Sequence, residues 1–309
     1  MMKKTQRWRL VVVLSALAGL LAAEVLLRRR DNLAHWAAPS DRLLAATQSL
    51  TWDAVQARRR VVVLGDSIAA GAQVSPSAAW PALAQQQLDD DQSGAWAIIN
   101  ASVPGETALQ GLLRVERDVL RWHPHLVLIA FGLNDGRLVG PTPADLWRRE
   151  LLCRGYLQPG PLYLFTWLRA QLRRAACRAD LTADPFDLRR SPPAEYRQAL
   201  RLSVDKIRQA DPKTRIMLIN LTPIGPACCA GRGAEGHAQQ AAAYEAYNAA
   251  VRDLVTELDV EMIDVSSPLR ASAQAIVLQD DGLHLTTAGQ TIVAAVVARR
   301  ISKLNIGRG

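Results

Sequence analysis

The chain has 309 residues, of which 49% are hydrophobic and 21% are charged, a composition typical of a globular protein with room for one large core. Such a composition argues against a disordered or fibrous chain. The formal net charge is +8, but no run of basic residues alternates with aromatic residues, so we expect no nucleic-acid partner.

The N-terminus has the pattern of an export signal. Four basic residues within the first nine precede an apolar stretch at positions 10–27. This stretch reaches the lower limit for a membrane-spanning helix and exceeds the usual core of a signal peptide. We therefore predict an uncleaved anchor at residues 1–30, with cleavage after Ala23 as the alternative, and a juxtamembrane connector at 31–60. The rest of the protein is then expected in the cell envelope, anchored to the inner membrane or released into the periplasm or medium.

From residue 61 onward, short apolar runs alternate with helical patterns. The predicted strands are 61–64, 95–99, 126–131, 215–220 and 260–265, and the predicted helices are 78–88, 107–122, 194–209, 237–258 and 286–303. This alternation is typical of a parallel sheet covered by helices on both faces. We therefore predict an α/β domain over 61–309, built as a three-layer sandwich around about five parallel strands, with ligands at their carboxyl ends.

One long segment interrupts the alternation between the third predicted strand and the next helix. This insertion, predicted at about 137–193, is rich in aromatic residues and arginines and is far longer than an ordinary connection. We interpret it as a lid or as an element that contacts substrate or membrane, and alternatively as a helical insertion with a small core of its own. It contains Cys153 and Cys177, which could form a disulfide in an oxidising compartment.

A Gly-Asp-Ser turn follows the first predicted strand. Ser67 in this turn stands where backbone N–H groups stabilise a developing oxyanion. A serine nucleophile needs a base, and the base needs an orienting carboxylate. Asp281 and His284 precede the last helix, three residues apart across a glycine, so they can turn toward each other and leave one ring nitrogen for Ser67. Taken separately, each stretch is also compatible with an ordinary turn or helix start.

Two further turns follow the second and third predicted strands and should lie on the same edge of the sheet. Gly105 lacks a side chain and can bring its N–H to a reacting oxygen, and Asn134 can add a side-chain amide. Together with the N–H of Ser67, these groups would form an oxyanion hole with three donors.

These four blocks, in this order, resemble the SGNH or GDSL hydrolases, a superfamily of serine esterases, lipases and thioesterases. The blocks are Gly-Asp-Ser at 65–67, NASVPGETALQ at 100–110, GLNDG at 132–136 and Asp-x-x-His at 281–284. The second and third look most like the branch of bacterial lysophospholipases and acyl thioesterases. Leu133 stands where that branch usually has a second glycine. This difference leaves the substrate open and does not change the predicted chemistry.

The resemblance implies a flavodoxin-like fold and a role for each matching residue. Ser67 would be the nucleophile and an oxyanion donor, Gly105 and Asn134 the other donors, His284 the base and Asp281 its orienter. Asp66 and Asp135 would be structural neighbours of these groups.

We therefore expect a serine hydrolase that cleaves carboxylic ester or thioester bonds of a small-molecule, lipid or glycan substrate. No metal or organic cofactor is expected, and the adjacent Cys228 and Cys229 match no standard zinc spacing. One alternative keeps the triad in an O-acetyltransferase or O-deacetylase acting on a cell-envelope glycan. Another is a noncatalytic envelope binding module. The oligomeric state is not indicated by the sequence.

Overall fold

The computed structural model describes residues 55–91, 95–138, 189–228 and 233–304, together with positions 15, 18–20 and 22 of an N-terminal helix. The chain divides into two compact units, Met1–Ala38 with Leu146–Thr182, and Pro39–Asp145 with Ala183–Gly309. The second unit contains the whole described sheet and every candidate site residue.

Several predicted features fall largely outside the described residues. These are the anchor at 1–30, the connector at 31–60 and the insertion at 137–193, as well as Cys153, Cys177 and Cys229. Within the described parts of the chain, no helix is both long enough and apolar enough to cross a membrane. The anchor, the insertion's role and the disulfide stay predictions.

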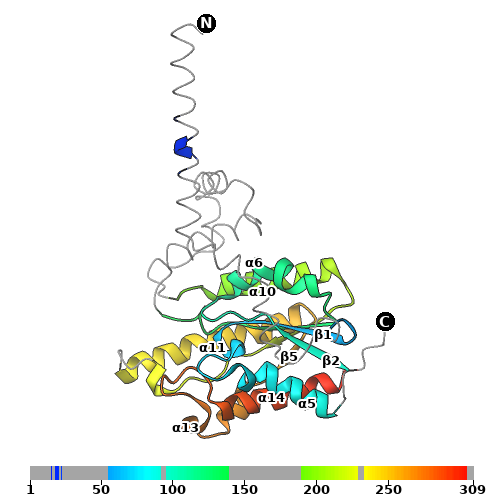
Figure 1. Ribbon diagram of the computed structural model, residues 1–309. Helices are drawn as coiled ribbons and strands as arrows, with labels where there is room; N and C mark the ends of the chain where they lie inside the picture. The colour runs from blue at the N-terminus through cyan, green and yellow to red at the C-terminus, as the bar shows by residue number, and fades with distance from the viewer. Residues whose placement is uncertain are drawn as a thin grey trace, which may run out of the picture. The chain divides into compact units, whose positions relative to one another are not determined.

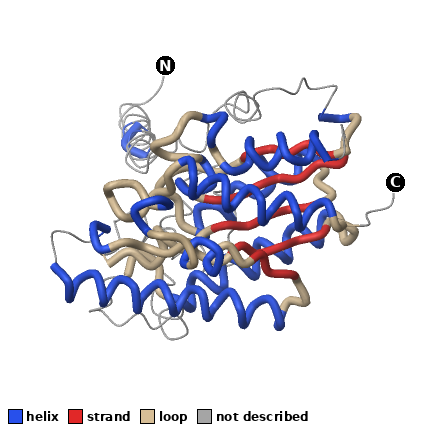
Figure 2. The backbone as a smooth tube through the Cα atoms, turned by 90° about the horizontal axis from the view of Figure 1, so that it is seen from below, coloured by secondary structure: helices blue, strands red, loops and turns tan. Residues whose placement is uncertain are grey.

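Five parallel strands form the sheet of the described core, in the order β2-β1-β3-β4-β5. They are β1 (Arg59–Gly65), β2 (Trp96–Asn100), β3 (Leu126–Ala130), β4 (Arg215–Ile219) and β5 (Glu261–Ile263), and Figure 2 shows them side by side. Residues 61–64 of β1 are fully buried, because the strand lies between β2 and β3 and has helices over both faces. The predicted parallel sheet is confirmed.

Helices cover both faces of this sheet (Figure 1). One face carries α6 (Ala108–Arg114) and α10 (Pro193–Ala210), and the other carries α5 (Trp80–Asp91) and α14 (Thr287–Ser302). The long helix α11 (Gly233–Glu257) packs against α10 and beside β4 and β5. Shorter elements are α4 (Ser67–Ala70), η2 (Pro76–Ala78), α12 (Ser266–Arg270) and α13 (Gln274–Val277). The predicted three-layer architecture is therefore confirmed.

The single helix predicted over 107–122 is wrong in one respect. α6 ends at Arg114 and is followed by a π-helical turn, η3 (Val115–Val119), and a 3-10 turn, η4 (Leu120–Trp122). The change of helix type coincides with the buried guanidinium of Arg114, which pairs with Glu106 before the helix and with Asp118 inside the π turn. Apolar periodicity does not report such a pairing.

The start of α11 also differs from the prediction. The helix begins at Gly233, four residues before the predicted start at His237. Glycine in a helix costs only about 1 kcal/mol relative to alanine, so the helix can include Gly233 and Gly236 ahead of the predicted start.

Candidate active site

Ser67 is the first residue of α4 and is separated from the end of β1 only by Asp66. Asp66 caps this short helix, because its Oδ1 accepts a hydrogen bond from the N–H of Ile68 at 3.0 Å. Gly65 is required by close packing, since a Cβ there would lie 2.9 Å from the carbonyl oxygen of Ala130. The strand therefore turns abruptly into a helix, and Ser67 lies at the carboxyl edge of the sheet with 7% of its surface exposed.

The loop before α14 brings an imidazole to this serine. Nε2 of His284 lies 3.1 Å from Oγ of Ser67, and Nδ1 of His284 lies 2.5 Å from Oδ2 of Asp281. The other carboxylate oxygen, Oδ1, accepts hydrogen bonds from the backbone N–H groups of Leu283 and His284, both at 2.9 Å. The three side chains form one line in which the imidazole can take the serine proton while the carboxylate stabilises the resulting positive charge.

Gly282 allows this loop to fold back on itself. Its φ is +64°, and a Cβ there would lie 2.6 Å from the backbone nitrogen of Cys228. The N–H of Gly225 donates to the carbonyl of Gly282 at 2.7 Å, and the N–H of Gln279 donates to that of His284 at 2.8 Å. The glycine between the acid and the histidine is thus required both by its left-handed backbone and by the neighbouring chain.

The carboxylate of Asp281 is held in its ionised form. Burial acts to raise its pKa, but hydrogen bonds from the imidazole of His284 and from the N–H groups of His284 and Leu283 outweigh burial and lower the pKa to about 2. An ionised carboxylate can only accept. The proton on the imidazole therefore lies on Nδ1, which leaves Nε2 free to act as a base toward Ser67.

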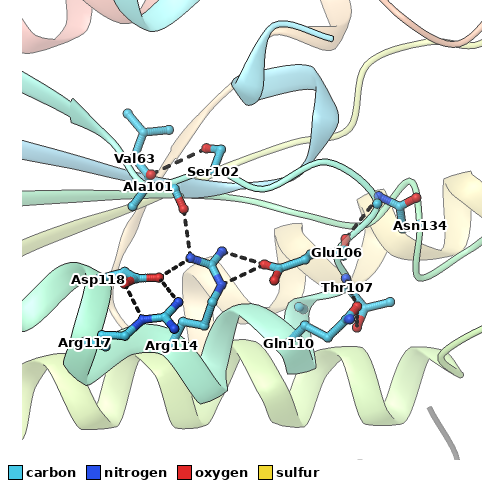
Figure 3. A network of polar contacts seen from close by, with 12 residues as sticks. Val63, Ala101, Ser102, Glu106, Thr107, Gln110, Arg114, Arg117, Asp118 and Asn134 are labelled. Atoms are coloured by element: carbon cyan, nitrogen blue, oxygen red, sulfur yellow. Dashed lines mark hydrogen bonds and ion pairs between the residues drawn. The ribbon is translucent and has the colours of Figure 1, made fainter. Parts of the chain in front are cut away.

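Gly105 and Asn134 follow β2 and β3, the strands on either side of β1. Gly105 has a φ of +81°, and no atom lies within 4 Å of a Cβ built on it, so the backbone conformation and not crowding favours glycine. Nδ2 of Asn134 donates to the carbonyl of Glu106 at 3.0 Å, which ties the two loops together (Figure 3). The amide of Asn134 has a second N–H that this contact does not use.

A buried ion network supports the loop of Gly105. Nε of Arg114 donates to Oε2 of Glu106 at 2.9 Å, and Nη1 donates to Asp118 at 2.5 Å and to the carbonyl of Ala101 at 3.1 Å (Figure 3). Burial acts to lower the pKa of Arg114, but Glu106 and Asp118 outweigh burial and raise it. The network thereby fixes the position of Glu106, whose carbonyl oxygen accepts the hydrogen bond from Asn134.

Arg190 contacts the same loop. Its Nη1 donates to the carbonyl of Gly105 at 2.6 Å, and its Nη2 donates to Oε1 of Gln110 at 3.3 Å. Arg190 directly follows an isolated antiparallel bridge between Leu138 and Arg189. The two ends of the predicted insertion therefore meet next to the loops that carry Gly105 and Asn134.

Asp66 and Asp135 hold two chain segments next to the site, the turn at Ser67 and the start of α6. Both oxygens of Asp135, which is fully buried, accept from the N–H of Ala108 at 3.1 Å. Burial raises the pKa of Asp66 to about 7 and that of Asp135 to about 8, and hydrogen bonds from backbone N–H groups oppose this rise. These contacts agree with the structural role that the sequence resemblance implied.

An apolar pocket lies next to α4. Its lining includes Ile68, Phe131, Leu133 and Leu221. Ser67 is not among the lining residues, although both of its sequence neighbours are. The pocket therefore lies beside the turn at Ser67 and does not extend over the hydroxyl.

Sequence comparison identifies the family of the chain. Residues 63–292 match the GDSL-like lipase/acylhydrolase family. The chain belongs to this family. The resemblance to the GDSL hydrolases stated from the sequence is thereby confirmed at the level of the family.

Two curated relatives of this GDSL-like hydrolase match part of its length. It is 39% identical over 93 residues to thioesterase 1/protease 1/lysophospholipase L1 of Escherichia coli K12, and 39% identical over 90 residues to esterase TesA of Pseudomonas aeruginosa. The matches cover 30% and 29% of this chain and 43% and 44% of the relatives. The chain thus spans less than half the length of the curated relatives it matches.

Solved structures share the fold of this GDSL-like hydrolase. A lipase/acylhydrolase from Enterococcus faecalis superposes with a TM-score of 0.54 and 21% identity, covering 81% of this chain and 100% of that chain. An acetylxylan esterase mutant, Axe2 S15A, from Geobacillus stearothermophilus superposes with a TM-score of 0.52 and 17% identity, covering 81% and 97%. At these identities the likeness concerns the fold alone.

The site contains residues that sequence reasoning predicted and others that it missed. Ser67, His284 and Asp281 meet in one hydrogen-bonded line, and Gly105 and Asn134 lie on the flanking loops. The supporting side chains Gln73, Glu106, Arg114 and Arg190 were not predicted. Gln73, Arg114 and Arg190 lie outside the four sequence blocks, and Glu106 lies within the block at 100–110 without a spacing that predicts its contact with Arg114.

Proposed function

We propose that this enzyme hydrolyses carboxylic esters or thioesters through Ser67, His284 and Asp281. The observation that carries the proposal is the pair of contacts on one imidazole, 3.1 Å to the serine oxygen and 2.5 Å to the carboxylate. Membership of the GDSL-like family supports ester hydrolysis in general. The roles of these three side chains and the choice of substrate are the proposal.

Acylation begins when Oγ of Ser67 attacks the carbonyl carbon of the ester. Nε2 of His284 takes the hydroxyl proton, and the carbonyl electron pair moves onto oxygen. The N–H groups of Ser67 and Gly105 and the amide of Asn134 donate to this oxyanion. His284 then gives its proton to the leaving alcohol or thiol as the C–O or C–S bond breaks, and the acyl group stays on Ser67.

Deacylation repeats the same steps with water. His284 takes a proton from a water molecule, whose oxygen attacks the acyl carbon. The tetrahedral intermediate expels Oγ of Ser67, which recovers its proton from His284, and the carboxylic acid leaves. Asp281 remains ionised in both halves and stabilises the imidazolium each time it forms.

The substrate that we propose carries an apolar acyl group. The Escherichia coli relative is named as a thioesterase and a lysophospholipase, which supports a lipid ester or thioester among the substrates.

Fluorophosphonate labelling of the full-length protein tests the nucleophile. We expect an adduct on Ser67, located by mass spectrometry, and Ser67→Ala is expected to lose both the adduct and at least about a thousandfold in hydrolysis of a short p-nitrophenyl ester. Ser272→Ala, which changes a serine on the loop after α12, is the matched control and should keep both.

The outcomes separate the competing functions. Turnover retained by Ser67→Ala, with circular dichroism showing a folded protein, rejects the mechanism. A folded parent with neither adduct nor turnover favours the noncatalytic binding module. Product analysis with and without a sugar acceptor separates hydrolysis from acetyl transfer to a glycan.

A further inference from the structure

We propose that Gln73 is a positioning residue for Asp281 and so extends the hydrogen-bonded line of Ser67, His284 and Asp281 by one member. This inference rests on the proposed function. Nε2 of Gln73 lies 2.7 Å from Oδ2 of Asp281, the oxygen that also receives Nδ1 of His284. The motifs of the sequence single out no residue at this position.

The backbone of Gln73 supports a dedicated role. Its φ is +67°, in the left-handed region that favours glycine and that glutamine rarely adopts. Such conformations persist where the surrounding structure determines them, and they gather at functional sites. The backbone of Gln73 therefore adopts a conformation that is unfavourable for its own residue type but places its side chain against Asp281.

The turn that begins at the nucleophile ends at Gln73. The helix α4 contains only four residues and closes at Gly71, whose φ is +73°. The N–H of Ala72 then donates to the carbonyl of Ser67 at 2.9 Å. A Cβ on Gly71 would lie 2.4 Å from the Cβ of Ala79, so the reversal requires glycine. Ser67 and Gln73 consequently belong to one compact turn.

The loop that carries Asp281 also contacts this turn through Gln279. Nε2 of Gln279 lies 3.5 Å from the carbonyl oxygen of Gln73 and 3.3 Å from that of Leu285. The side chain and the backbone of Gln73 therefore both contact the loop that carries Asp281 and His284. The turn that contains Ser67 and the loop that contains Asp281 are therefore in contact on the Nδ1 side of the imidazole, away from the Ser67 hydroxyl.

Asp281 benefits from such a partner because it is partly open to solvent. Its side chain is 36% exposed, so water competes for Oδ2. Since an ionised carboxylate only accepts, the glutamine atom that faces it is the amide nitrogen. That nitrogen also lies 3.2 Å from Nδ1 of His284, but both atoms donate to Oδ2, and their mutual contact is not a hydrogen bond in the tautomer that acts as a base. The amide thus orients the carboxylate without adding charge.

A substitution series at position 73 tests the proposal through His284. Gln73→Met removes the donor at similar size, Gln73→Glu adds a negative charge, and Gln73→Arg keeps donors while adding a positive charge. A negative charge stabilises the imidazolium and a positive charge destabilises it. Among the described residues, the charged group in contact with the imidazole is Asp281; Asp280 adjoins it in the loop, and Asp66 precedes Ser67.

The expected results differ in direction. The acid limb of the kcat/KM profile should move to higher pH for Gln73→Glu and to lower pH for Gln73→Arg. We expect kcat to fall about tenfold for Gln73→Met with KM unchanged, equivalent to about 1.4 kcal/mol. Gln73→Gly serves as the backbone control: it adopts the positive φ without strain, so its Tm should at least equal that of the parent while its kcat falls as in Gln73→Met.

NMR titration of the imidazole measures the pKa of His284 without any substrate, with His284→Gln used for assignment. If the parent neither hydrolyses esters nor reacts with the fluorophosphonate, the proposed function fails, and opposite shifts for Glu and Arg still support the Gln73 contact. If the parent is active but the Met and Gly variants keep its kcat, or Glu and Arg shift His284 in the same direction, the role of Gln73 is overturned and the proposed function stands.

Discussion

At the scale of single residues, Asp135 links burial to a dependence of stability on pH. Burial raises its pKa from the ordinary value of 3.8 to about 8, opposed by the N–H of Ala108 and reinforced by nearby Glu195. Between these two values the folded protein binds a proton that the unfolded chain has released. The folded state therefore holds more protons, and the free energy of unfolding falls as the pH rises through this window.

Asp135→Asn is expected to flatten this dependence. Asparagine stays neutral at every pH, and its amide oxygen can still accept from the N–H of Ala108. Urea unfolding from about pH 4 to pH 8 should show a loss of stability in the parent that exceeds the loss in the variant by on the order of a few kcal/mol. Asp66, with a pKa raised to about 7, acts in the same direction and remains in both proteins.

A variant whose stability falls as steeply as that of the parent would contradict this role for Asp135. The low pKa of Asp281 has the opposite sign, because a depressed pKa adds stability as the pH rises. Its contribution is gained between about pH 2 and pH 4 and is already complete across most of the window in which Asp135 titrates.

At the scale of elements, the junction of α6 and η3 supports the site through Arg114. Its guanidinium is 4% exposed and is shared between Glu106, next to Gly105, and Asp118, inside the π turn. Desolvation of such a group is costly, and buried ion pairs are therefore weak stabilisers relative to apolar packing. Removal of one partner is nevertheless severe, because it leaves the other charges buried and unpaired.

Arg114→Met is expected to lower the free energy of unfolding by about 3–5 kcal/mol. Asp118 keeps its contact with Arg117 at 2.6 Å, so much of the loss should come from Glu106. Arg252→Met is the matched control, because Arg252 pairs with Glu245 at 3.1 Å on the surface and should contribute about 0–1 kcal/mol. Equal losses in the two variants, measured by urea unfolding, would rule out a special role for the buried network.

The elements also show where pattern reasoning succeeds. The apolar run of β1 predicted a buried parallel strand, and the structure places that strand between two others. The break of the helix predicted over 107–122 was not predictable from apolar periodicity, because Val115 and Val119 are buried as they would be in a continuous helix and the pairing of Arg114 leaves no trace in that pattern. Local propensity describes a segment alone, whereas the ion pair at this break includes Glu106 in a preceding loop.

At the scale of the whole molecule, we propose that residues 1–30 attach the hydrolase domain to a membrane. The basis is the sequence: an apolar stretch at 10–27 follows four basic residues. A protein lacking residues 1–30 is expected to move from the membrane pellet to the soluble fraction. Its rate of ester hydrolysis should be unchanged, since every candidate site residue lies beyond position 60.

A matched variant separates apolar insertion from attraction of the basic residues. Leu17→Arg in the full chain places a charge within the apolar stretch, which costs about 2.5–3.5 kcal/mol at the centre of a spanning helix. It keeps all the basic residues and should still weaken membrane association. Pelleting of the truncated protein to the same extent as the parent would refute attachment through this segment.

The order of strands and helices along the chain, the parallel sheet and the edge at which the site lies could all be predicted from the sequence. This was possible because apolar periodicity, turn residues and the direction of parallel strands are local properties, and because Gly-Asp-Ser and Asp-x-x-His each follow a recognisable boundary. The close contact of Ser67 with His284, 217 positions away, was inferred from chemistry and resemblance.

The side chains that support those groups could be identified only from the folded chain. Gln73 meets Asp281 across 208 positions, Arg190 meets Gly105 across 85, and Arg114 lies between Glu106 and Asp118. Glutamine and arginine occur commonly on solvated surfaces, so the residue type alone does not predict which group such a side chain contacts. Its partner is chosen by the packing of separate loops at one edge of the sheet, which depends on the whole chain at once.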